Sequence, residues 1–119
     1  MNLDRRYNLT PKGMKFVEKS EGEELLAFQL KAEKIPFERE VRFDPFRRWL
    51  FDFVLTDDLS AEVEGGIWIQ GRHNRASSIE KDFEKYNSAA IRGWRVLRFS
   101  TAMVEDGRAL ETIKKALKP

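Results

Sequence analysis

Short apolar stretches with a two-residue period alternate along this chain with longer segments whose apolar positions recur every three or four residues. The two-residue period is typical of β-strands, and the longer period is typical of amphipathic helices. The first pattern predicts strands at residues 37–43, 49–55, 59–64 and 94–99. The second predicts helices at residues 20–34, 78–92 and 107–117. This order predicts an α/β fold in which helices flank a mixed four-stranded sheet.

The second predicted strand, residues 49–55, is apolar except for Asp52, so we expect it to be buried on both faces. A carboxylate inside such a strand is costly unless it is paired, which makes Asp52 a candidate functional residue. The next strand ends in Glu62 and Glu64, which share one face because side chains alternate along a strand. If these strands pair, Asp52 lies within several ångströms of Glu62, because paired strands are roughly 4.8 Å apart. Three such carboxylates repel each other unless a cation neutralises them, solvent screens them or their pKa values shift.

Composition narrows the class of protein. The 119 residues suffice for one domain, which we assign to residues 17–119 after a polar extension at residues 1–16. The absence of cysteine excludes disulfides and thiolate metal sites. No apolar run approaches the roughly 20 residues that span a bilayer. The N-terminus lacks the apolar core of a signal peptide, so we expect a cytoplasmic protein without a membrane partner.

The net charge of +2 does not by itself indicate nucleic-acid binding, so the distribution of the basic residues matters more than their sum. Basic residues cluster in three places. The first cluster is Arg47 with Arg48, the second is Arg72 with Arg75, on either side of His73, and the third is Arg92, Arg95 and Arg98. The first two clusters are candidate contacts for a DNA backbone.

Around the acidic residues, the sequence resembles the PD-(D/E)XK nuclease superfamily: Asp52 is followed, after nine residues, by Glu62-Val63-Glu64. More narrowly, it resembles small Vsr-like endonuclease-domain proteins of phages and mobile elements. Five segments carry this resemblance in the expected order: residues 50–53, 62–66, 71–73, 82–87 and 93–98. The resemblance covers about residues 20–117 and implies a restriction-endonuclease-like αβββαβ(α) core.

The resemblance implies a metal-dependent DNA endonuclease that hydrolyses phosphodiester bonds and leaves a 5′-phosphate and a 3′-hydroxyl. It implies Mg²⁺ or Mn²⁺ bound by Asp52, Glu62 and the backbone carbonyl of Val63, and oxygen ligands of this kind suit hard cations. Three further expectations rest on analogy alone. These are action on particular DNA structures in phage DNA processing, recombination or repair, assembly as a homodimer, and residence in a bacterial or phage-infected host cell.

One position departs from the superfamily pattern. The usual lysine two residues after the glutamate is Glu64 here, and a carboxylate cannot stabilise the negative charge that develops on the phosphate. The Vsr-like branch shares an acid at this position, so Glu64 stays among the candidate catalytic residues. Lys85 is the first candidate to supply the missing cation. His73 is the second, as a general base or a phosphate ligand.

Glu23 has two alternative interpretations. Ser20 and Glu23 match a capping box at the start of the first predicted helix, in which the Glu23 carboxylate would bind a backbone N–H. Alternatively, Glu23 is the acid that many superfamily members add to the metal site from their first helix. The two roles compete for one carboxylate.

Two alternatives without catalysis stay open. The missing lysine is compatible with a DNA-binding or assembly module that has this fold and no activity. Asp52 could instead form a structural ion pair with Arg48 or Arg98. Loss of DNA cleavage on substitution of Asp52 or Glu62 would separate an enzyme from both alternatives.

Overall fold

The computed structural model describes residues 17–64 and 76–119. Its first half consists of α2 (Val17–Ala32), β1 (Glu38–Arg42), β2 (Leu50–Val54) and β3 (Leu59–Glu64). Its second half consists of α3 (Ala76–Ile91), β4 (Arg95–Ser100), α4 (Thr101–Glu105) and α5 (Arg108–Leu117). The predicted order of elements is confirmed, with α4 as an additional short helix. The predicted extension at residues 1–16 lies outside the described residues.

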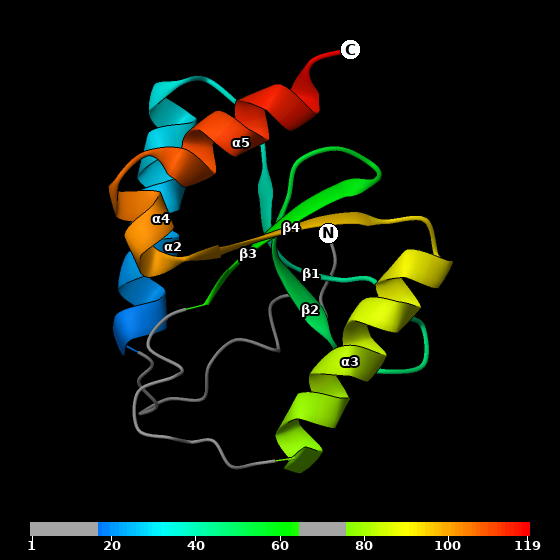
Figure 1. The fold of residues 1–119 in the computed structure, drawn as a ribbon. Helices are drawn as coiled ribbons and strands as arrows, with labels where there is room; N and C mark the ends of the chain where they lie inside the picture. The colour runs from blue at the N-terminus through cyan, green and yellow to red at the C-terminus, as the bar shows by residue number, and fades with distance from the viewer. Residues whose placement is uncertain (1–16, 65–75) are drawn as a thin grey trace.

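The four strands form one mixed sheet in the order β1-β2-β3-β4. The first three strands form an antiparallel meander, and β4 pairs parallel to β3 after the crossover through α3. Helices α2, α4 and α5 gather on one side of the sheet, and α3 covers the other side (Figure 1). This arrangement confirms the predicted α/β fold with helices on both faces of a four-stranded sheet.

The main core lies between the sheet and helices α2, α4 and α5. Leu26 and Leu30 of α2 are fully buried against Ala61 and Val63 of β3. The other buried members of this core are Ala27, Phe53, Phe99, Val104, Ala109 and Ile113. Because Ala61 and Val63 both face this core, Glu62 between them points to the opposite face, toward α3.

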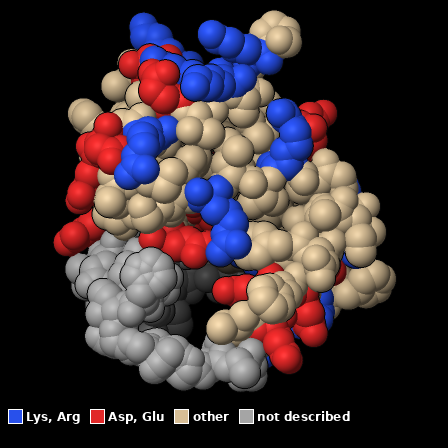
Figure 2. Space-filling view, viewed as in Figure 1, with Lys and Arg blue, Asp and Glu red and all other residues tan. Residues whose placement is uncertain are grey.

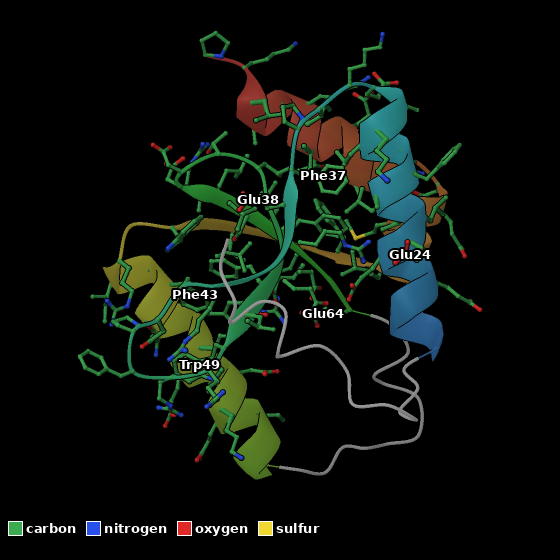
Figure 3. All side chains as sticks on the ribbon, turned by 180° about the vertical axis from the view of Figure 1, so that it is seen from behind. Glu24, Phe37, Glu38, Phe43, Trp49 and Glu64 are labelled. Carbon is green, nitrogen blue, oxygen red and sulfur yellow. The ribbon has the colours of Figure 1, made fainter. Side chains whose placement is uncertain are left out.

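A second, aromatic cluster lies on the α3 side of the sheet. Phe43 stacks on Phe51 with ring centroids 4.0 Å apart, and Trp94, which follows α3, meets Phe51 edge-on at 5.0 Å. Phe43 and Trp49 lie beside α3, whereas Phe37 lies on the side of α2 (Figure 3). The contact of Trp94 with Phe51 holds the segment that follows α3 against the sheet, and α3 contributes side chains to the candidate site.

Gly22 allows α2 to approach the sheet closely. A Cβ atom added at Gly22 would lie 2.7 Å from the Thr101 Oγ1 and 3.0 Å from a Val63 methyl group. Both distances are shorter than ordinary van der Waals contact, so a side chain at this position would push α2 away from β3 and α4. The absence of a side chain therefore sets the spacing between α2 and the end of β3 that carries Glu62 and Glu64.

Two predictions about helix ends have different outcomes. Helix α2 begins at Val17, so Ser20 lies inside the helix and the predicted capping box at Ser20 and Glu23 is wrong. The reason is that the helical segment continues toward the N-terminus beyond the residue that was expected to cap it. Gly93, in contrast, has a left-handed φ of 87° two residues after the end of α3, as expected for a glycine that ends a helix.

Candidate active site

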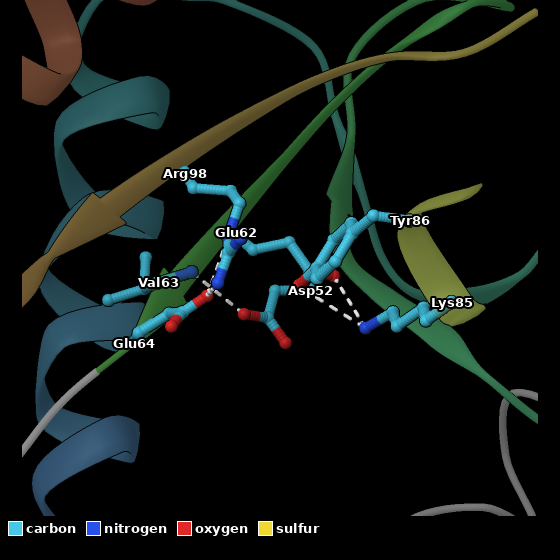
Figure 4. Close-up of polar contacts among 7 residues, drawn as sticks. All are labelled: Asp52, Glu62, Val63, Glu64, Lys85, Tyr86 and Arg98. Atoms are coloured by element: carbon cyan, nitrogen blue, oxygen red, sulfur yellow. Dashed lines mark hydrogen bonds and ion pairs between the residues drawn. The ribbon is translucent and has the colours of Figure 1, made fainter. Parts of the chain in front are cut away.

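The structure brings Asp52 and Glu62 together on neighbouring strands. The β2–β3 register pairs Val54 with Ser60 and Phe53 with Ala61, so the next position along sets Asp52 opposite Glu62. The Asp52 Oδ2 accepts a hydrogen bond of 2.8 Å from the Val63 N–H (Figure 4). Asp52 is 7% exposed and Glu62 is 4% exposed.

The Glu62 carboxylate is held by two neighbouring side chains of α3. The Lys85 Nζ donates to both Glu62 oxygens, at 3.1 Å to Oε1 and 3.0 Å to Oε2. The Tyr86 hydroxyl donates a hydrogen bond to Oε1. Burial raises the pKa of Glu62 most, the Lys85 charge opposes this rise, and the nearby Asp52 charge adds to it. Burial and the adjacent Glu62 carboxylate also raise the pKa of Tyr86, so its hydroxyl stays protonated as a donor.

Glu64 is engaged by an arginine of the neighbouring strand. The Arg98 guanidinium donates to the Glu64 Oε2 from Nε at 2.9 Å and from Nη2 at 2.7 Å. The same guanidinium lies over the Tyr86 ring, 4.3 Å from its centroid. Glu64 is therefore ion-paired in this structure, and the expected repulsion among three carboxylates is reduced to the Asp52–Glu62 pair.

Glu40 is a residue near the site that the sequence pattern does not reveal. The β1–β2 register pairs Arg39 with Phe53 and Val41 with Phe51, which sets Glu40 opposite Asp52. Glu40 has a left-handed φ of 55°, a conformation that is uncommon for residues other than glycine. Nothing in the sequence marks Glu40, because residues that adopt this backbone without strain are glycine and asparagine.

Glu23 forms an ion pair rather than a helix cap. Its Oε1 lies 3.2 Å from the Arg39 Nη2, and Glu23 is only 6% exposed. Arg39 also reaches Glu24 at 3.1 Å and lies over the Phe53 ring at 5.1 Å. A role of Glu23 in metal binding stays a prediction.

The residues present fit a divalent cation only through a pair of carboxylates. Within residues 17–64 and 76–119, no three histidine or acidic side chains are grouped closely enough to hold a metal ion. Mg²⁺ keeps several of its waters and binds through one or two carboxylates, so Asp52 and Glu62 are a sufficient donor set. The predicted ligation by the Val63 carbonyl stays a prediction, and His73 lies outside the described residues.

The predicted DNA contacts are described only in part. Arg47 and Arg48 are exposed in the segment before β2. Arg47 lies over the Trp49 ring at 4.1 Å and reaches Glu84 of α3 at 3.4 Å. Acidic and basic side chains are interspersed on the face shown in Figure 2, without a broad basic patch among the described residues. Arg72 and Arg75 lie outside the described residues.

Hydrophobicity along the described part of the chain gives no helix long and apolar enough to cross a membrane.

The fold has a match among solved structures. No protein-family model matches the chain, and no curated protein matches it. The catalytic domain of the homing endonuclease I-Bth0305I has a similar structure, with a TM-score of 0.62 and 21% sequence identity. The match covers 79% of this chain and 90% of that domain. The chain therefore has a nuclease-like α/β fold, in which the Asp52–Glu62 pair lies at the meander of the sheet.

Proposed function

We propose that this protein is a metal-dependent DNA endonuclease of the PD-(D/E)XK type, most similar to its Vsr-like branch. The buried pair of Asp52 and Glu62 on adjacent strands is the observation that carries this proposal. Two buried acids of like charge are costly unless a cation or a hydrogen-bonding environment offsets the cost. The similarity to a homing endonuclease catalytic domain supports phosphodiester hydrolysis over other chemistry on this fold.

In this proposal Asp52 and Glu62 bind Mg²⁺ or Mn²⁺. A cation bound there would polarise the scissile phosphate, lower the pKa of the attacking water and stabilise the leaving oxygen. Asp52 is oriented by the Val63 N–H, and Glu62 is oriented by Tyr86. Lys85 supplies the positive charge that Glu64 cannot supply, because the Lys85 ammonium lies beside the Glu62 carboxylate.

The proposed substrate is DNA. Exposed Arg47 and Arg48 would contact its backbone, as would Arg72 and Arg75. Backbone contacts fix the position of a protein on DNA without reading its sequence, which favours recognition of DNA shape or structure. A homodimer that cuts both strands is part of the proposal by analogy.

A cleavage assay tests the proposed function. Wild-type protein, Glu62→Gln and the control Glu80→Gln are incubated with linear, nicked, flapped and four-way-branched DNA in Mg²⁺, Mn²⁺ or EDTA. Glu80 is exposed on α3, so its variant changes the charge by the same amount away from the site. We expect cleavage by wild type and Glu80→Gln only with metal, and a rate lower by about 100-fold or more in Glu62→Gln.

The two other outcomes are equally informative. Metal-dependent cleavage by Glu62→Gln at the wild-type rate would show that the active site lies elsewhere. DNA binding without cleavage under every condition would favour the non-catalytic module, with Glu64 in place of the usual lysine as the reason.

A further inference from the structure

Lys85 provides a positive charge beside the buried carboxylate of Glu62. Its ammonium lies 3.0 and 3.1 Å from the two Glu62 oxygens. The Lys85 side chain is 16% exposed, and that of Glu62 is 6% exposed, so little water screens the pair. Tyr86, the next residue on α3, contacts the same carboxylate through a neutral hydroxyl. One carboxylate therefore has a charged and an uncharged partner from consecutive positions of one helix.

We propose that Lys85 is the counter-ion of Glu62 in the metal-free protein, that it competes with the divalent cation for this carboxylate, and that metal binding releases its ammonium toward the DNA phosphate. Tyr86 has the opposite role, because it holds the carboxylate in the orientation that the metal requires. This inference rests on the proposed function, since it assumes that Glu62 is a metal ligand.

The competition follows from charge and geometry. A buried carboxylate needs a positive partner, and Lys85 provides one at both oxygens. A metal ion on either Glu62 oxygen would lie close to the ammonium, and two cations at such a distance repel each other. Lysine has a long flexible side chain with rotatable donors, so the ammonium is able to withdraw while its Cα stays in α3. After it withdraws from Glu62, the ammonium still lies near the metal site. A phosphate oxygen of bound DNA is its natural partner there.

Tyr86 is placed to act in both states. Its hydroxyl donates to the Glu62 Oε1, and its ring lies 4.3 Å from the Arg98 guanidinium. Arg98 is in turn fixed by Glu64 at 2.7 Å. A carboxylate oxygen has two lone pairs, so a hydroxyl donor leaves a position for a metal. Donors of this kind orient metal ligands, and their loss typically lowers metal affinity about 10- to 100-fold.

Neighbouring substitutions should therefore change metal affinity in opposite directions. Binding of Mn²⁺ to metal-free protein, without DNA, is measured by calorimetry and by electron paramagnetic resonance of the free ion. Relative to wild type, we expect Lys85→Met to lower the Kd for Mn²⁺ about 10-fold, because a repelling charge is removed. We expect Tyr86→Phe to raise the Kd about 10-fold or more. Lys85→Gln, which keeps a hydrogen-bond donor without the charge, should behave like Lys85→Met.

Lys81→Met is the matched control. Lys81 is exposed one helical turn before Lys85, so its variant makes the same change in net charge without a described contact to Glu62. Its Kd should stay within about twofold of wild type, because exposed charges are screened by salt. At saturating Mn²⁺, Lys85→Met should also cleave DNA more slowly than Lys81→Met despite its filled metal site.

The outcomes separate this inference from the proposed function. If wild type binds Mn²⁺ and Asp52→Asn does not, the metal site stands. An unchanged or higher Kd in both Lys85→Met and Lys85→Gln would then overturn the competition alone. If wild type and Asp52→Asn bind Mn²⁺ equally weakly, the metal site itself is wrong, and the inference is rejected with it.

Discussion

Asp44 connects the segment before β2 with helix α3 through a single buried carboxylate. Its Oδ1 accepts hydrogen bonds from the Phe46 N–H at 2.7 Å and the Arg47 N–H at 3.0 Å. Its Oδ2 accepts from the Ser88 hydroxyl at 2.7 Å. Because Ser88 lies within one helical turn of the α3 residues that contact Glu62, Asp44 also stabilises the position of α3 over the site.

The acid dependence of stability should report on this carboxylate. The Ser88 hydrogen bond lowers the pKa of Asp44 most, burial opposes this effect, and the two backbone N–H groups and Arg92 add to it. A carboxylate with a lowered folded-state pKa stabilises the protein above its unfolded-state pKa, and this contribution is lost as the pH falls through the folded-state value. We expect Asp44→Ala to lower the melting temperature at pH 7. Below about pH 4, the melting temperature of this variant should approach that of wild type.

Asp57→Ala is the control for this measurement, because Asp57 is an exposed acid of the turn between β2 and β3. Its melting temperature should follow that of wild type across the same pH range. A constant difference between Asp44→Ala and wild type from pH 7 to about pH 3 would contradict the ionic role of Asp44.

Residues of the site differ in how far the sequence predicts them. Asp52 could be found because it is the one acid in an otherwise apolar strand, and Glu62 follows from strand pairing. Tyr86 could not be assigned, because an aromatic residue on the inward face of a helix usually indicates packing. The Glu64–Arg98 pair depends on the parallel β3–β4 register, which no local pattern encodes.

At the scale of secondary-structure elements, the close contact at Gly22 predicts that Gly22→Ala destabilises the protein. Helix propensity alone would predict the opposite. In an exposed helix, glycine to alanine stabilises by about 1 kcal/mol. At Gly22 the new Cβ would lie 2.7 Å from the Thr101 Oγ1, and overpacking typically costs about 1–3 kcal/mol. We therefore expect Gly22→Ala to lower the free energy of unfolding, measured by urea denaturation.

A double-mutant cycle identifies the cause of this effect. Thr101→Ala removes the Oγ1 that the new methyl group would meet at 2.7 Å. Adding Thr101→Ala to Gly22→Ala should recover part of the lost stability, although the Val63 contact at 3.0 Å remains. Additive effects of the two substitutions would show that the contact with the Thr101 Oγ1 is not the cause.

The elements themselves were predictable to different degrees. The strands and helices α2, α3 and α5 were predicted from hydrophobic periods, although Ile79 and Phe83 of α3 are exposed. Helix α4 has only five residues, too few to display a helical period. Its start is marked only by Ser100, whose hydroxyl accepts from the Met103 N–H at 3.1 Å. The inclusion of Ser20 within α2 escaped prediction because serine is of a residue type that commonly caps a helix.

At the scale of the whole molecule, the candidate site depends on the complete sheet with its crossover. Asp52 comes from β2, Glu62 from β3 and Lys85 from α3, so the site combines the meander with the crossover helix. The site is therefore absent from the unfolded chain, and a ligand that binds it binds only the folded state. The proposed binding of a metal would be coupled to folding for this reason.

This coupling predicts a metal-dependent melting temperature. A ligand at about 100 times its Kd stabilises the folded state by about 2.7 kcal/mol. For a chain of this size that corresponds to roughly 10 °C. We expect Mn²⁺ to raise the melting temperature of wild type by about this amount and to leave that of Asp52→Asn almost unchanged, as measured by differential scanning calorimetry.

The metal-free melting temperatures of the same two proteins separate a metal site from a structural ion pair. The charge of Asp52 raises the pKa of Glu62, so the two carboxylates repel each other when no metal is bound. The Asp52→Asn variant would keep a side-chain oxygen that accepts from the Val63 N–H while losing this repulsion. We therefore expect Asp52→Asn to melt at or above the wild-type temperature in EDTA and below it in Mn²⁺. A lower melting temperature in both conditions would mean that the charge of Asp52 stabilises the fold, as the ion-pair alternative requires.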